Sequence, residues 1–340
     1  MTERKLSEIR IEAHTTYYYM IFFAPNNSIF CERNKYIMKI KFHLPDFYGN
    51  IRMNLAFADL LKSNPEYFYD NVEIASSYGC FPPAAWNGGR TVVGAVRREG
   101  IDRTIEEYNK RGIPIRYTFT NPLVTEKHLK DSFCNMITRI AENGLNEIIV
   151  NVPCLEEYIR KNYPSYPLIS STVKQLEDKD ELLAELEKDY KLVVLDYNWN
   201  NRFEELNELP HKDKIELLIN PYCTPHCRRR KLHYEYLGER QFEHNMQVFG
   251  NDQLKPIDRK EFPCPNMSMS FYEITKFDTF ISVDDIYQKY VPMGYSNFKI
   301  EGRMMHPVDI LESYIYYLIK PEQRDYLRVI MLKQLMRQVK

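Results

Sequence analysis

Residues 113–152, IPIRYTFTNPLVTEKHLKDSFCNMITRIAENGLNEIIVNV, contain a strand, a helix and a second strand, and this unit decides the fold class. The runs 113–119 and 147–152 are apolar and rich in β-branched residues, which predicts buried strands. Between them an apolar stripe recurs at spacings of three and four residues: Leu129, Phe133, Ile137, Ile140 and Ala141. This stripe predicts a helix over 126–142 that stops at Asn143-Gly144. Because a helix connects them, the two strands are expected to be parallel.

The same alternation continues along the chain. The predicted strands are 72–77, 113–119, 147–152, 167–171, 191–196, 214–219, 278–282 and 297–301. Eight buried strands that alternate with helices indicate an α/β fold, a closed (β/α)8 TIM-type barrel. A doubly wound open sheet is the alternative, but no G-x-G-x-x-G follows the first predicted strand.

The domain prediction places the barrel at 71–320. Residues 1–70 are expected to be an N-terminal extension that packs on the barrel, and residues 321–340 a C-terminal helix. Repeats, low-complexity tracts and Gly/Ser linkers are absent from the sequence, which favours one compact domain.

Composition excludes some classes of function. The chain has 340 residues and a formal net charge of −1, so it lacks the strongly basic character of general nucleic-acid binders. Its longest apolar run, near 17–23, is too short to cross a bilayer, and a cytoplasmic protein without a membrane span is expected. In a reducing cytoplasm, the 7 cysteines are expected to be metal ligands or buried thiols rather than disulfides.

The carboxyl ends of the strands in such a barrel meet at one face, which carries the active site. Polar residues near these ends are the candidate substrate-binding residues: Arg90, Asn121, Asn151, Asn198 and Arg303. Arg90 ends the sequence WNGGR, in which two glycines let the backbone approach a ligand; a plain Gly-Gly turn is the alternative. Lys299 and Glu301 alternate along the last strand and can both point inward, as a catalytic pair or as a structural ion pair.

The cysteines suggest a metal centre. In NPYCTPHCRRRKLHY, residues 220–234, two cysteines lie four residues apart and would share one face of a helix. Thiolates suit iron–sulfur clusters and zinc, although a structural zinc site would more typically show a second tight pair. The expected cofactor is a [4Fe–4S] cluster, with zinc as the alternative, and its expected ligands are Cys223, Cys227, Cys264 and Cys80. The fourth place could instead be filled by Cys31 or Cys154 or stay open to a substrate; free thiols are the remaining alternative.

Two motifs resemble the peptidase U32 family. Residues 220–234 resemble its N-E-x-C-x-x-x-C-P-x-R-x-x-H region, and TFISVDDIYQKYVPMGYSNFKIEGR, residues 279–303, resembles its barrel-closing segment. The resemblance implies a TIM-type barrel and a cysteine-bound [4Fe–4S] cluster, as in members that support oxygen-independent hydroxylation of ubiquinone precursors or of tRNA and rRNA bases. Other members are collagenase-like peptidases. By position, the residues that match the family motifs are Cys223, Cys227, Lys299, Glu301 and Arg303.

The chain also departs from the family pattern. Pro221 replaces the acidic residue before the cysteine pair, and Arg228 stands where proline is usual. Proteolysis is disfavoured because the sequence shows neither a Ser/His/Asp arrangement nor H-E-x-x-H. The predicted function is therefore a U32-like iron–sulfur enzyme that acts on a small molecule or a nucleobase, for example as a hydroxylase or with a protein partner subunit. The alternatives are a non-catalytic cluster-binding scaffold or electron-transfer partner, and a metal-dependent hydrolase or peptidase.

Overall fold

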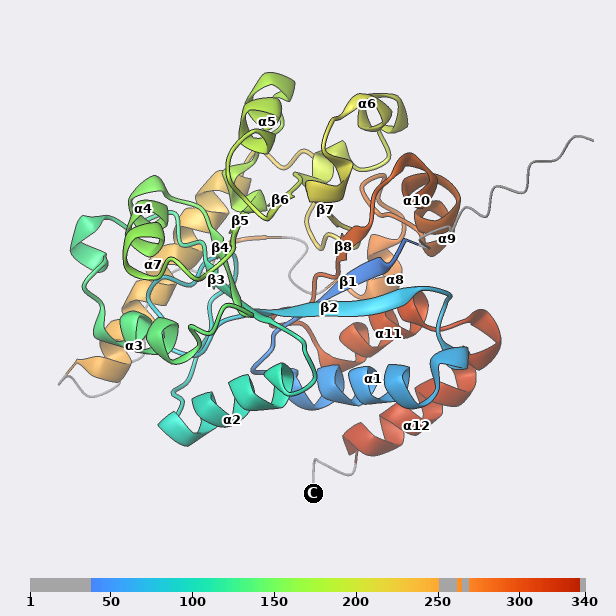
Figure 1. Cartoon of the computed structure of the whole chain (residues 1–340), viewed down its shortest axis with the longest axis horizontal. Helices are drawn as coiled ribbons and strands as arrows, with labels where there is room; N and C mark the ends of the chain where they lie inside the picture. Colours follow the sequence, from blue (N-terminus) through green and yellow to red (C-terminus); the bar gives the residue numbers. More distant parts are fainter. Residues whose placement is uncertain (1–37, 251–261, 265–268, 337–340) are drawn as a thin grey trace, which may run out of the picture. The chain divides into compact units, whose positions relative to one another are not determined.

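A closed barrel of parallel strands forms the centre of the protein. The computed structural model describes residues 38–250, 262–264 and 269–336. The strands are β1 (Ile40–Pro45), β2 (Val72–Gly79), β3 (Ile115–Phe119), β4 (Glu147–Val150), β5 (Leu168–Ser170), β6 (Leu192–Val194), β7 (Ile215–Leu218) and β8 (Asn297–Lys299). Each strand pairs with the next, and β8 pairs with β1, which closes the barrel (Figure 1). The predicted (β/α)8 TIM-type barrel is confirmed.

Helices follow the strands and cover the outside of the barrel (Figure 1). The α-helices are α1 (Ile51–Ser63), α2 (Arg98–Asn109), α3 (Ser132–Ile140), α4 (Pro153–Asn162), α5 (Lys179–Leu186), α6 (Phe203–Glu208), α7 (Arg230–Phe249), α8 (Phe271–Ile274), α9 (Val283–Asp285), α10 (Val291–Met293), α11 (Pro307–Leu318) and α12 (Arg324–Met336). Helix α3 begins where Asp131 accepts a hydrogen bond from the Cys134 N–H, which is a typical N-cap.

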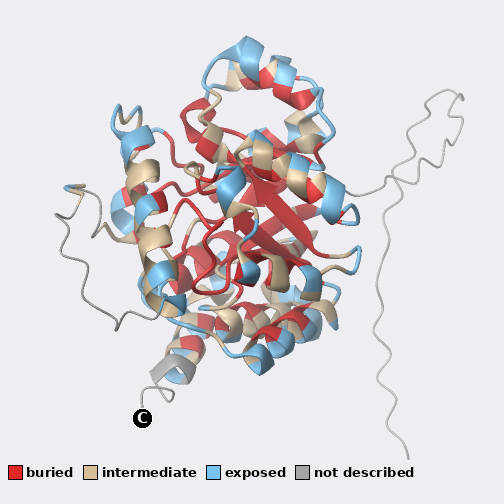
Figure 2. Cartoon of the chain, turned by 90° about the vertical axis from the view of Figure 1, so that its left-hand side faces the viewer, coloured by how far each residue is buried: buried red, intermediate tan, exposed pale blue. Residues whose placement is uncertain are grey.

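The residues of the barrel strands are mostly buried, as the red colour in Figure 2 shows. Ile148 and Val150 point to the shell between strands and helices, whereas Ile149 belongs to a smaller apolar cluster with Tyr78 and Ile169. This division follows from the two-residue period of a strand, because the small cluster holds the alternate residues. The continuous apolar runs in the sequence therefore reflect burial on both faces.

The barrel begins earlier than predicted. Strand β1 (Ile40–Pro45) lies inside the segment assigned to an N-terminal extension, and the part of the chain from Met38 onward forms one compact unit. Residues 1–37 lie outside the described residues. At the other end, α12 (Arg324–Met336) falls within the predicted C-terminal helix.

The predicted strand at 278–282 was wrong. Its apolar residues are buried, but side-chain amides hold its backbone: Asn200 donates to the Thr279 carbonyl at 2.7 Å, and Asn201 to the Phe280 carbonyl at 2.8 Å. These amides take carbonyl groups that a strand would offer to its neighbour. The eighth barrel position belongs to β1 instead.

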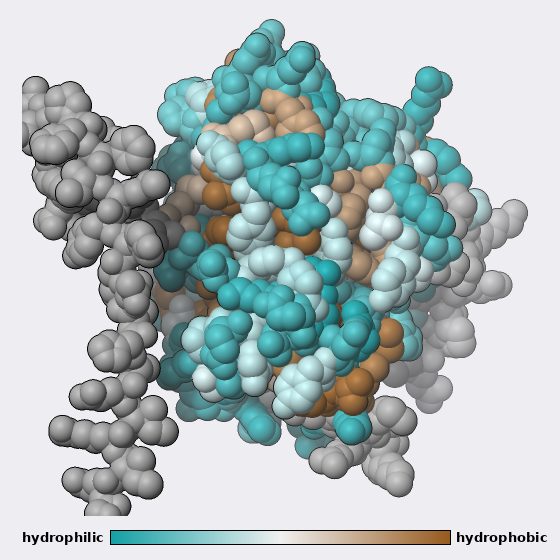
Figure 3. All heavy atoms as spheres, turned by 90° about the vertical axis from the view of Figure 1, so that its right-hand side faces the viewer, coloured by the Kyte–Doolittle hydropathy of each residue, from teal (hydrophilic) through white to brown (hydrophobic). Residues whose placement is uncertain are grey.

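The surface shown in Figure 3 is mainly hydrophilic, with separate hydrophobic areas. Within the described part of the chain, every helix is too short or too polar to traverse a lipid bilayer.

Candidate functional site

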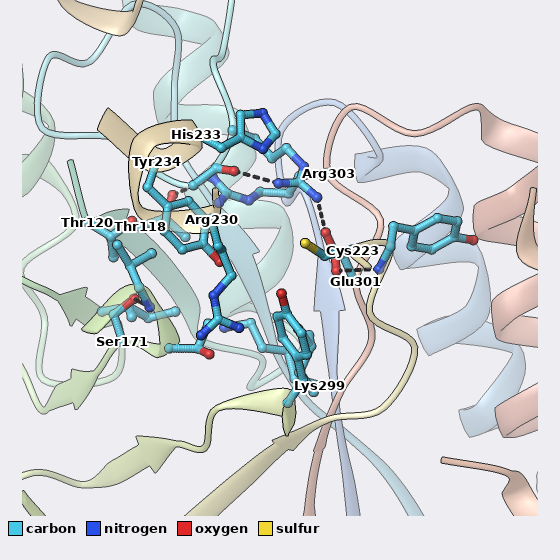
Figure 4. A pocket seen from close by; sticks show the side chains of 18 of the residues that line it. Thr118, Thr120, Ser171, Cys223, Arg230, His233, Tyr234, Lys299, Glu301 and Arg303 are labelled. Atoms are coloured by element: carbon cyan, nitrogen blue, oxygen red, sulfur yellow. Dashed lines mark hydrogen bonds and ion pairs between the residues drawn. The ribbon is translucent and has the colours of Figure 1, made fainter. Parts of the chain in front are cut away.

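A cavity lies at the carboxyl ends of the barrel strands. Its inner chamber has a volume of about 90 Å³. The strand ends and the loops after them contribute lining residues: Tyr78, Thr118, Ile149, Ser171, Tyr197, Leu218 and Lys299. In the view of Figure 4, Thr118, Thr120 and Ser171 lie across the chamber from Cys223 and Glu301. The cavity therefore occupies the face where barrel enzymes carry their active sites.

Arg303 is the most unusual charged group of the inner chamber. Its side chain is nine-tenths buried, with 9% exposure. Its guanidinium donates to Asn87 Oδ1 at 3.0 Å, Thr118 Oγ1 at 2.9 Å and the Gly88 carbonyl at 2.8 Å. These partners are neutral, and no carboxylate of the described residues lies within ion-pairing distance. Burial, followed by the charge of Arg90, lowers the pKa of Arg303.

Arg90 and Glu301 form an ion pair at the wall of the chamber. Arg90 Nη2 donates to Glu301 Oε1, and the other carboxylate oxygen accepts a hydrogen bond from the Tyr222 N–H at 3.0 Å. Both oxygens of Glu301 therefore have partners, as expected of a carboxylate that positions the arginine. Of the two predicted catalytic residues, Glu301 lines the chamber in this fixed role.

Lys299 also lines the chamber, at the end of β8. Its Nζ lies 3.3 Å from Oε1 of the fully buried Glu216 and 4.1 Å from the centroid of the Tyr78 ring. Burial lowers the pKa of Lys299 to about 8, and the charges of Arg116 and Arg303 act in the same direction. A lysine with this pKa is partly neutral at physiological pH, so it can act as a base or nucleophile.

Helix α7 supplies a wall of the cavity that was not predicted from the sequence. Arg230, His233 and Tyr234 line the inner chamber. Arg230 forms an ion pair with the buried Asp196 and donates to Glu177 Oε1 at 3.1 Å, which joins α7 to two barrel loops. Helical spacing is the signal that could have revealed this face of α7, because His233 and Tyr234 follow Arg230 by three and four residues. A search for apolar stripes does not detect this face, because the residues on it are polar.

The predicted asparagines lie elsewhere. Asn121, Asn151 and Asn198 are not among the lining residues of the cavity. Asn121 donates to the carbonyls of Ala85 and Gly238, both at 3.1 Å, and Asn198 Oδ1 accepts from the His226 N–H at 3.1 Å. These amides hold loops together around the barrel mouth, whereas Arg90 and Arg303 face the cavity.

The two glycines of WNGGR permit a close backbone approach, but to another strand. A Cβ at Gly88 would lie 2.3 Å from the carbonyl carbon of Thr120, and Gly89 has a left-handed φ of 73°. This contact brings the loop after β2 against the end of β3 and places the Gly88 carbonyl where Arg303 donates to it.

The cysteine pair does not lie on a helix. Helix α7 begins only at Arg230, and His226 between the two cysteines has a left-handed φ of 52°. Cys223 and Cys264 line the inner chamber, and Cys227 is close enough to influence the pKa of Cys223.

The other candidate ligands either do not line the cavity or lie outside the described residues. Cys80 is fully buried in the apolar shell, where burial raises the pKa of its thiol, and it is not among the lining residues. The Cys154 thiol donates to the Val124 carbonyl at 3.7 Å, and Cys31 lies outside the described residues. Across the described ranges, no three His, Cys, Asp or Glu side chains are grouped to hold a metal ion. The expected set of four cysteines is therefore not assembled in this structure.

An outer chamber of about 290 Å³ adjoins the inner one. The two share Arg90, His233 and Arg303 among their lining residues. Apolar and aromatic side chains make up much of the outer wall: Tyr236, Leu237, Phe262, Met304 and Met305. The His233 and Phe262 rings stack at 4.7 Å. The cavity thus joins a small cationic chamber to a larger, more apolar one.

No protein-family model matches the chain, and its sequence has no significant match among curated proteins. Among solved structures, the chain is similar to the one described as "The Structure of the U32 Peptidase Mk0906". The similarity has a TM-score of 0.44 and 11% sequence identity, and it covers 78% of this chain and 94% of that chain.

Proposed function

We propose that the protein is a barrel enzyme that binds a small anionic substrate in the inner chamber. The observation that carries this proposal is Arg303, a guanidinium that is nine-tenths buried and has only neutral hydrogen-bond partners. A buried charge is costly without a counterion, and a carboxylate or phosphate would supply one in bidentate geometry.

The other cations of the chamber already have carboxylate partners within the protein. Arg90 pairs with Glu301, Arg230 with Asp196, and Lys299 with Glu216. Arg303 is therefore the arginine of the inner chamber that an anionic ligand would neutralise. An enzyme fits better than a passive binding protein, because a lysine of lowered pKa lines the same enclosed chamber.

Ligand-induced stabilisation tests the anion site. Inorganic phosphate and pyruvate should each raise the melting temperature of the wild-type protein, because a ligand that binds only the folded state stabilises it. The shift should be lost in Arg303→Met and kept in Arg98→Gln, which removes an exposed arginine of α2. Equal shifts in wild type and Arg303→Met would refute the proposal. If Arg303→Met does not fold, Arg303→Lys tests the same site with its charge retained. We then expect a smaller rise in melting temperature, because lysine lacks the planar guanidinium that binds an anion through two parallel hydrogen bonds.

A second candidate is the iron–sulfur protein that the sequence motifs suggest. The observation in its favour is that Cys223 and Cys264 line one chamber, with Cys227 nearby. A cluster there would supply redox chemistry for a small molecule or nucleobase, as an enzyme or with a partner subunit. In the described part of the chain, the cysteines are not grouped as ligands of a metal ion.

Anaerobic purification followed by iron and sulfide analysis tests this candidate. Cys223→Ala, Cys227→Ala and Cys264→Ala should lose iron, whereas Cys80→Ala should keep it, because Cys80 belongs to the apolar shell. Iron-free protein after anaerobic reconstitution would contradict the candidate.

A further inference from the structure

Lys299 has the position of a nucleophile. It is the last residue of β8, its side chain is only 8% exposed, and it lines the inner chamber. Lys299 Nζ lies 4.1 Å from the centroid of the Tyr78 ring, and Arg303 Cζ lies 5.9 Å from the same centroid. The amine and the guanidinium therefore lie near one ring in the wall of the same chamber.

Burial and two neighbouring arginines favour the neutral form of Lys299. Arg116 and Arg303 act on it from β3 and from the loop after β8, and only the Glu216 carboxylate opposes them. With a pKa of about 8, roughly one Lys299 in ten is neutral at pH 7. An ordinary lysine, with a pKa of about 10.4, is neutral in fewer than about one molecule in a thousand at that pH.

Glu216 does not depend on the charge of Lys299. Its Oε2 accepts a hydrogen bond from Arg116 Nη1 and lies 3.5 Å from His43 Nε2. Arg116 is itself fully buried and holds Glu147 on its other side. When Lys299 loses its proton, the buried carboxylate thus keeps a cationic partner. This separates Lys299 from a lysine whose only role is to neutralise a carboxylate.

We propose that Lys299 forms a Schiff base with the carbonyl carbon of a small oxo acid whose carboxylate is bound by Arg303. This inference rests on the anion site proposed above and names its substrate class. The neutral amine attacks the carbonyl carbon, and the oxygen takes a proton to give a carbinolamine. Loss of that oxygen as water leaves a C=N bond to Lys299. No oxidant or reductant is needed, and the resulting imine can serve as an electron sink for bond cleavage next to it.

Borohydride trapping tests the imine directly. Wild-type protein is incubated with pyruvate, reduced with sodium borohydride, digested and mapped by mass spectrometry. The peptide that contains Lys299 should gain the mass of pyruvate less one oxygen atom, because reduction of the imine adds two hydrogens after water is lost. The exposed Lys179 gives the background for non-specific modification.

Variants separate the nucleophile from the anion site. Lys299→Arg should keep the stabilisation by phosphate but lose the adduct, and Arg303→Met should lose both. Adduct formation in the wild type should rise as the pH passes through about 8. Stabilisation by phosphate without an adduct on Lys299, or an adduct no stronger than that on Lys179, would refute the nucleophile and leave the anion site intact. Mapping in the wild type decides the question even if Lys299→Arg fails to fold.

Discussion

Lys299 Nζ lies 3.3 Å from Glu216 Oε1 inside the barrel, although both side chains are buried. The other carboxylate oxygen is shared by Arg116 and His43. The four residues come from β8, β7, β3 and β1, so one network of charged and polar side chains joins strands that are far apart in sequence. Burial by itself raises the pKa of Glu216, yet its cationic neighbours hold that pKa well below its usual value.

Glu216→Gln should destabilise the protein by about 3–5 kcal/mol, because removing one partner leaves buried cations without compensation. Urea unfolding at pH 7 measures the change. Glu208→Gln, at an exposed pair with Lys179, should stay within about 0.5 kcal/mol of wild type. A loss below about 1 kcal/mol for Glu216→Gln would show that the network does not hold the barrel together.

Protonation of His43 should make the free energy of unfolding depend on pH. Burial, followed by the charge of Arg116, lowers the pKa of His43 to about 3, below the value of about 6.5 expected in the unfolded chain. The unfolded state then binds more protons between these values, so this contribution is complete above pH 6.5 and is lost as the pH falls toward 3.

His43→Gln should therefore flatten the decline of stability between pH 6.5 and 4, by up to about 1.4 kcal/mol per pH unit. Urea unfolding across this range measures the slope. His211→Gln, at a histidine near the protein surface, should leave the slope unchanged. An identical slope in wild type and His43→Gln would contradict a neutral buried imidazole.

The barrel could be predicted because its strands carry apolar runs and its helices an apolar stripe. The mistake at 278–282 arose because burial alone does not make a strand. Asn200 and Asn201, about 80 residues earlier, bind its carbonyls, and a local pattern cannot reveal this contact. Counting that segment as a strand left β1 (Ile40–Pro45) outside the predicted barrel, in the segment predicted to be an N-terminal extension.

The residues of the site could be predicted from the sequence where they lie at or just after the end of a strand. Lys299 and Arg303 follow from the position of β8 and face the cavity. Asn121 also follows a strand, but its side chain donates to the carbonyls of Ala85 and Gly238. An asparagine side chain hydrogen-bonds backbone groups as readily as it binds a ligand, so its position at a strand end does not identify its partner. Arg230 could not be assigned, because the course of α7 across the mouth depends on the tertiary fold.

Gly88→Ala should disturb the site more than the addition of one methyl group suggests. The new Cβ would lie 2.3 Å from the Thr120 carbonyl carbon, and neither backbone can move without displacing the loop that binds Arg303. We expect a loss of about 1–3 kcal/mol in stability, typical of overpacking, together with loss of phosphate binding. Gly100→Ala, within α2, is the matched control and should change stability by less than about 1 kcal/mol. Wild-type phosphate binding in Gly88→Ala would show that this contact does not position the guanidinium.

The outer chamber should determine how large a substrate the enzyme accepts. Its volume of about 290 Å³ exceeds the 90 Å³ of the inner chamber, and Leu237 contributes to its apolar wall. Wild-type protein should therefore bind phenylpyruvate, whose ring can pack in the outer chamber, more tightly than pyruvate.

Leu237→Trp should fill that space, because a larger side chain then occupies the volume that the ring needs. We expect at least about a tenfold loss of phenylpyruvate affinity, equivalent to about 1.4 kcal/mol, with little change for pyruvate or phosphate. Isothermal titration calorimetry measures all three ligands on the same variant. Val329→Trp, at an exposed position of α12, is the control for a new surface tryptophan. A parallel loss of all three ligands would show that Leu237→Trp disturbs the anion site itself, and no loss of any would place the phenyl ring outside this chamber.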